Sequence, residues 1–147
     1  MQNISSYKDL TVWRKSVELA VITYRLTNGL PKDELYGISS QLKRASVSVA
    51  SNIAEGSIRG SKKDFCHFLR IASGSIAELQ TQIEICKRLP FWEKLDYNEI
   101  DSLSVEINKM IHGLIAKLKL WTFLSTIYCL LSTFHEIPSS TIYRGRG

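Results

Sequence analysis

The sequence predicts an all-α protein with the fold of an antiparallel, up-down-up-down four-helix bundle. Three observations lead to this prediction. Apolar residues recur every three or four positions in four long segments, as on one face of a helix. Residues that start or end helices separate the segments. The connections are only a few residues long, which forces consecutive helices to run antiparallel.

The composition fits a single domain of this kind. The chain has 147 residues, of which 44% are hydrophobic and 22% charged, so it is long enough to bury a sizeable core. We expect residues 7–119 to form the bundle domain. Residues 120–147 form an apolar C-terminal extension whose structure the sequence does not define.

The first predicted helix runs from Leu10 to about residues 27–29, and the second starts at the N-cap Asp33 and stops at Gly56. The first helix has the apolar stripe Leu10, Trp13, Val17, Ala20 and Tyr24. The second has the stripe Leu35, Ile38, Leu42, Ala45, Val49 and either Asn52 or Ile53.

The third predicted helix begins after Ser61, which together with Asp64 resembles a capping box, and it ends before Pro90. Its stripe is Phe65, Leu69, Ala72, Ile76, Leu79, Ile83 and Cys86. Gly74 lies inside this helix, where glycine costs about 1 kcal/mol relative to alanine. We therefore expect Gly74 to mark a close approach of two helices.

The fourth predicted helix begins at a second capping-box pair, Asp96 and Glu99, and runs to about Lys119. Its stripe is Ile100, Leu103, Ile107, Met110 and Leu114. Residues 120–134 then carry no charge. They either extend the fourth helix, cover an assembly surface, or lack a defined conformation. A membrane helix needs about 20 apolar residues, so a membrane partner is not expected.

Many apolar residues fall outside the four stripes. They are Leu19, Ile22, Leu26, Val47, Ala50, Ala54, Ile71, Ile85, Ile111 and Ile115. If some of them face outward, self-association through a second helical face follows, because monomers rarely expose large apolar patches. The alternative is that the core stripes are wider than the minimum.

The positive charge is concentrated between Gln41 and Arg70, which carries about +4 of the chain's formal +5. The basic residues are Lys43, Arg44, Arg59, Lys62, Lys63 and Arg70, opposed only by Glu55 and Asp64. We expect them to cluster at the corner between the second and third helices and to neutralise the phosphates of a nucleic acid.

The residues next to these cations indicate how a nucleic acid would be bound. The helix start at Ser61 either offers free N–H groups to a phosphate or is an ordinary solvated turn. Phe65 and Phe68 lie on or near the core stripe, so no platform for stacking unpaired bases is expected. Helix shape and charge would do the recognition.

No set of residues indicates an enzyme, a metal site, a cofactor or a small-molecule substrate. The corner lacks the spacing of a nucleotide phosphate loop, and the acid–histidine pair of di-metal bundles occurs only once, as Asp64 and His67. Asn52 and Glu55 are polar residues among aliphatic ones. They either form structural hydrogen bonds or contact a ligand.

The cysteines and the N-terminus favour a cytoplasmic protein. Cys66, Cys86 and Cys129 are odd in number and have no CxxC spacing, which is typical of reduced thiols rather than of disulfides or zinc ligands. The first ten residues lack the profile of a secretory signal.

Three motifs resemble a known family. They are YKDLTVWRKSVELA from Tyr7, the piece NIAEG-x-x-R from Asn52 to Arg59, and FL-x-IA-x-GS from Phe68 to Ser75. Over about Tyr7 to Lys119 the chain resembles the bacterial four-helix-bundle proteins related to those encoded by intervening sequences in large-subunit ribosomal RNA genes. The resemblance implies a small, basic, non-enzymatic bundle that forms homopentamers.

A related branch of the family sharpens the functional expectation. Its members, the accessory variability determinants of diversity-generating retroelements, work with a reverse transcriptase and bind nucleic acid through a basic surface. We expect this chain to bind structured RNA or DNA. The alternative is a protein-interaction adaptor, or an accessory subunit of a reverse transcriptase, whose charge meets an acidic partner.

Overall fold

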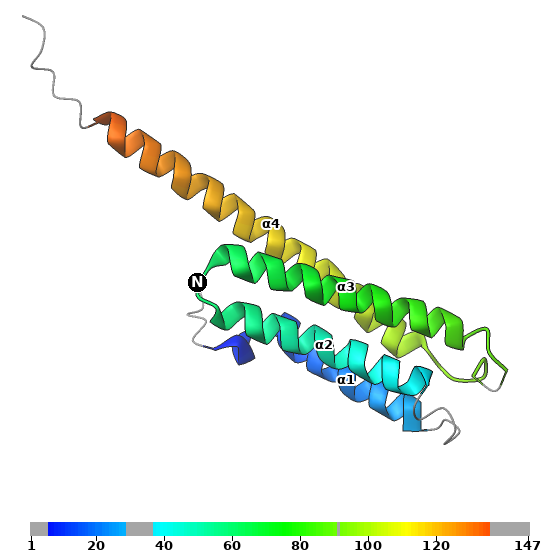
Figure 1. Cartoon of the computed structure of the whole chain (residues 1–147). Coiled ribbons are helices and arrows are strands. Elements are labelled where there is room, and N and C mark those ends of the chain that lie inside the picture. Colours follow the sequence, from blue (N-terminus) through cyan, green and yellow to red (C-terminus); the bar gives the residue numbers. More distant parts are fainter. Residues whose placement is uncertain (1–5, 29–36, 91, 136–147) are drawn as a thin grey trace, which may run out of the picture.

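The computed structural model describes residues 6–28, 37–90 and 92–135. A short 3-10 helix, η1 (Tyr7–Asp9), precedes four α-helices: α1 (Thr11–Asn28), α2 (Ile38–Ile58), α3 (Lys62–Cys86) and α4 (Asn98–His135). Consecutive helices run antiparallel (Figure 1), and α1 also packs against α4, so each helix contacts two others around one core. The all-α four-helix prediction is confirmed.

The core face of α1 differs from the predicted stripe. Its buried residues are Val12, Ser16, Leu19, Ile22, Thr23 and Thr27, whereas Val17 and Tyr24 are exposed. The hydroxyls of Ser16, Thr23 and Thr27 donate to carbonyls four residues earlier at 2.7, 2.7 and 2.9 Å. This satisfies them inside the core. Because three of the buried positions of α1 are polar, the spacing of apolar residues does not identify this face as the buried one.

The predicted stripes of α2 and α3 are confirmed within the described residues. Leu42, Ala45, Val49 and Ile53 are buried on α2, and Leu69, Ala72, Ile76, Leu79, Ile83 and Cys86 on α3. The predicted cap Asp33 and stripe residue Leu35 lie outside the described residues. On α4 the core is wider than predicted, because Ile111 and Ile115 are buried together with Ile100 and Ile107.

The predictions for Gly56 and for Gly74 are both wrong. Gly56 does not end α2, which continues to Ile58. The chain turns at Gly60, where φ is +79°. Gly56 is buried, and a Cβ placed there would lie 2.5 Å from Cβ of Phe68. A Cβ at Gly74 would meet nothing within 4 Å. The close approach of α2 and α3 is therefore at Gly56.

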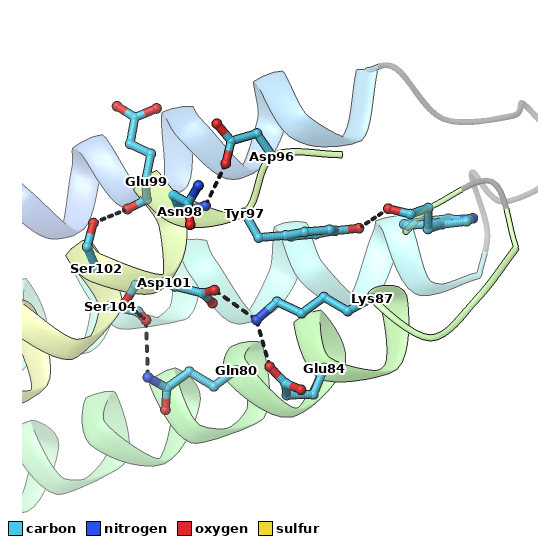
Figure 2. Close-up of polar contacts among 11 residues, drawn as sticks. Gln80, Glu84, Lys87, Asp96, Tyr97, Asn98, Glu99, Asp101, Ser102 and Ser104 are labelled. Atoms are coloured by element: carbon cyan, nitrogen blue, oxygen red, sulfur yellow. Dashed lines mark hydrogen bonds and ion pairs between the residues drawn. The ribbon is translucent and has the colours of Figure 1, made fainter. Parts of the chain in front are cut away.

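Polar contacts hold α4 against the end of α3 (Figure 2). The Lys87 ammonium donates to Asp101 at 2.8 Å and to Glu84 at 2.7 Å. Both hydrogen bonds raise the pKa of Lys87, and the one to Asp101 has the larger effect. Gln80 donates to Ser104 at 3.1 Å one turn further along α4.

The connection between α3 and α4 also has an apolar anchor. Tyr97 is buried, and its hydroxyl donates to the carbonyl of Trp92, also buried, at 2.9 Å. Asp96 accepts from the backbone N–H of Asn98 at 2.9 Å, but the carboxylate of Glu99 points away from this cap in Figure 2. Of the predicted capping-box pair, only the side chain of Asp96 therefore accepts a hydrogen bond from the start of α4.

Helix α4 does not end near Lys119 but continues to His135. No glycine or proline interrupts residues 114–135, so nothing in the sequence stops the helix there. Among the α4 residues whose burial is described, Ile115 is the last buried one, and α4 then projects beyond the end of the bundle (Figure 1). Of the three conformations expected for residues 120–134, the structure shows the extended fourth helix.

Candidate nucleic-acid interface

The start of α3 is fixed by its cap. The backbone N–H of Asp64 donates to the Ser61 hydroxyl at 3.0 Å, and that hydroxyl donates to the Asp64 carboxylate at 2.6 Å. Capping of this kind satisfies backbone donors that have no partner within the helix. The first turn of α3 therefore presents Lys62 and Lys63 at a defined position beside α4.

A hollow of about 740 Å³ lies between the start of α3 and the projecting part of α4. We call it the α3–α4 hollow. It is lined by Lys62, Lys63, Cys66 and Arg70 of α3 and by Lys119, Thr122, Phe123, Ser125 and Thr126 of α4. Three of the six predicted cations meet here, joined by Lys119.

The cations of the α3–α4 hollow have no carboxylate partners among the described residues. The ion pairs found among the described residues involve other cations: Lys15, Arg25, Arg59 and Lys87. The ammonium of Lys62 lies 4.6 Å from the ring centroid of Trp121. Four positive charges without an ion pair among the described residues, with only the carboxylate of Asp64 in the same turn as Lys62 and Lys63, attract an anion to this hollow.

Arg59 is already occupied. Its guanidinium pairs with the carboxylate of Glu55 one turn earlier and lies 5.0 Å from the ring centroid of Phe68. The pair is exposed, so it contributes little to stability. Because Glu55 offsets its charge, Arg59 adds less to the positive potential of the corner than Lys62 and Lys63 do.

Lys43 and Arg44 lie elsewhere. They line a second hollow of about 550 Å³ with Tyr24 and Val47, and the ammonium of Lys43 lies 5.2 Å from the ring centroid of Tyr24. Arg59, the C-cap residue of α2, lies fifteen positions after Arg44, or about 22 Å along the helix axis. The expectation that all six cations cluster at the corner is therefore wrong: three line the α3–α4 hollow, two line the second hollow, and Arg59 lines neither.

Asn52 faces the contact between α2 and α3. Its amide donates to the carbonyl and the hydroxyl of Ser48 at 2.8 and 3.0 Å, and that hydroxyl lies 2.9 Å from the hydroxyl of Ser75 on α3. These contacts satisfy polar atoms in a half-buried position.

Sequence reasoning missed Lys119, Trp121 and Phe123. The available signal was the antiparallel order itself, since an antiparallel α4 brings its later turns alongside the first turns of α3. Because the sequence predicts the fourth helix only to about Lys119, it does not predict the contact of Trp121 with Lys62.

Two further features bear on the class of site. Within the described residues, no group of three histidines, cysteines or acids is placed to hold a metal ion, and the thiols of Cys66 and Cys86 are buried. Among the described helices, none has an apolar stretch long enough to cross a bilayer.

Comparisons with known proteins cover the bundle. The model of the 23S rRNA-intervening sequence protein family matches residues 8–113. Among solved structures, the chain is similar to a protein of unknown function from the S23 ribosomal protein family of Bacteroides thetaiotaomicron VPI-5482. The identity is 29%, the TM-score is 0.63, and the match covers 71% of this chain and 98% of that chain. No curated protein matches the chain.

Proposed function

The chain belongs to the 23S rRNA-intervening sequence protein family, and from this premise we propose that it is a non-enzymatic, cytoplasmic protein that binds RNA or DNA through its basic surface. The observation that supports this most is the α3–α4 hollow, where Lys62, Lys63, Arg70 and Lys119 have no acidic partners among the described residues. Phosphates are anions that such a group neutralises without reading sequence.

We propose a second, weaker contribution from Lys43 and Arg44. They lie about 22 Å along α2 from the corner and on a different pair of helices, beside Tyr24 of α1. A short ligand in the α3–α4 hollow would not reach them. They would contribute when several copies assemble and their basic groups combine into a larger surface.

Self-association is part of this proposal. Val17, Val21 and Tyr24 are exposed one turn apart on α1, and Tyr24 adjoins exposed Val47 of α2. We call these four residues the α1–α2 stripe. An apolar stripe of this kind favours a contact between copies, and the family resemblance implies five copies.

The direct test measures the salt dependence of binding to a structured RNA. We expect Lys62→Ala with Lys63→Ala to weaken binding and to reduce the slope of log affinity against log salt by roughly 2, since each phosphate contact contributes about one unit. The matched control is Lys94→Ala with Lys109→Ala, which removes two exposed lysines remote in sequence from the corner.

The outcomes separate the two candidate functions. Equal loss in both double variants would mean that net charge alone, not the hollow, drives binding. A wild-type chain that binds no nucleic acid at low salt would reject the proposal and favour the adaptor or reverse-transcriptase accessory role, in which the cations meet an acidic protein.

A further inference from the structure

The most exposed aromatic rings near the cations lie on the projecting part of α4. Trp121 is 47% exposed and Phe123 is 63% exposed. They lie beyond residue 113, where the family match ends, and the Bacteroides relative is matched over 98% of its own length but only 71% of this chain. The part of the chain that the family model matches therefore does not include these rings.

Both rings adjoin the unpaired cations. Phe123 lines the α3–α4 hollow together with Lys62, Lys63, Arg70 and Lys119. The Trp121 ring lies 4.6 Å from the ammonium of Lys62. One exposed ring thus lies inside the hollow with the cations, and a second lies beside it against Lys62.

A site that combines aromatic rings with cations distinguishes single-stranded from double-stranded nucleic acid. In a duplex the base faces are stacked on one another, so a protein ring has nothing to stack on. In a single strand the base faces are free, and they stack on aromatic side chains while cations follow the backbone. A volume of about 740 Å³ lies within the range of small-ligand sites, so the hollow has room for a nucleotide.

We propose that the α3–α4 hollow binds single-stranded nucleic acid, with phosphates at its lysines and Arg70, one base stacked on Phe123 inside the hollow and a second base stacked on Trp121 beside it. This inference rests on the proposed function and narrows it. The sequence predicted recognition without stacking because Phe65 and Phe68 belong to the core side of α3; the stacking rings come from α4 instead.

The test compares two labelled ligands of equal length, an unstructured oligo-uridine and a hairpin duplex, with the full-length chain. We expect Trp121→Ala and Phe123→Ala each to weaken oligo-uridine binding roughly tenfold, in line with the usual worth of one stacked base. Hairpin binding should change less than about threefold, and the salt slope for both ligands should not change.

The matched control is Leu120→Ala with Leu124→Ala. Both leucines are exposed on the same segment and neither lines the hollow, so the control removes apolar surface without removing a ring. Quenching of tryptophan fluorescence by oligo-uridine, lost in Trp121→Ala, would support the proposal independently.

Three results would overturn it. Unchanged oligo-uridine binding in the aromatic variants would reject stacking while leaving the proposed function standing. Absence of binding to either ligand by the wild type would reject both. Loss of self-association in the aromatic variants, with binding unchanged, would show that a second copy of the chain covers the hollow.

Discussion

Gly56 and Gly74 both lie inside helices but in opposite surroundings. At Gly56 an added Cβ would lie 2.5 Å from Cβ of Phe68 and 3.2 Å from the Phe65 ring, so α2 and α3 would have to separate. At Gly74 the added methyl group would meet nothing within 4 Å.

We therefore expect Gly56→Ala to destabilise the protein by about 1–3 kcal/mol, as overpacking does. Gly74→Ala should stabilise it by up to about 1 kcal/mol through helix propensity. Urea denaturation followed by circular dichroism measures both. A stabilising Gly56→Ala would mean that the helices are not in tight contact there, and a strongly destabilising Gly74→Ala would mean that another copy packs against α3.

Also at the residue scale, sequence patterns located only part of the candidate site. Lys62, Lys63 and Arg70 were identified from the charge between Gln41 and Arg70, because that charge is local in the sequence. Lys119 and Phe123 were not identified, because their proximity to Lys62 depends on how far α4 continues and on where it crosses α3.

At the scale of the elements, Tyr97 anchors the connection between α3 and α4. Burial raises the pKa of its hydroxyl to about 12, above the value of about 10 for an unfolded tyrosine. The folded state therefore holds this proton more tightly than the unfolded state. The resulting stability is present below pH 10 and is lost as the pH rises toward 12.

We expect the free energy of unfolding to fall above pH 10, and to fall less steeply in Tyr97→Phe, which has no proton to lose. The variant should be less stable at neutral pH by about 1 kcal/mol, because the carbonyl of Trp92 loses its donor. Urea denaturation between pH 8 and pH 11.5 measures this. Parallel curves for wild type and variant would contradict the assignment.

Part of the alkaline loss should remain in that variant. The pKa of Lys87 is also raised, chiefly by its hydrogen bond to Asp101, so the stability from this contact is likewise lost as the pH rises. Deprotonation of Tyr97 and of Lys87 therefore both lower the free energy of unfolding as the pH rises.

At the scale of the whole molecule, two apolar surfaces could drive association: the α1–α2 stripe and the projecting part of α4, where Leu120, Leu124 and Tyr128 are also exposed. We expect assembly through the α1–α2 stripe, because it belongs to the bundle that the family model matches. Val21→Glu should then reduce the mass in light scattering to the 16.7 kDa of one chain.

A chain ending at Lys119 should keep its assembled mass, since every core residue among the described ones precedes that point. The control Thr81→Glu places the same charge at an exposed position of α3 and should leave the mass unchanged. If instead the shortened chain is monomeric and Val21→Glu is not, association belongs to the projecting helix.

The sequence by itself determined the helical class, the order of the helices, the core face of α3 and the cap at Ser61. Each of these depends on spacing or composition within one segment, or on the length of a connection. Only the tertiary structure decided which face of α1 is buried, which glycine touches a neighbouring helix, and that Lys62 meets Trp121. The physical reason is that burial and close contact depend on the opposing surface, which comes from another part of the chain.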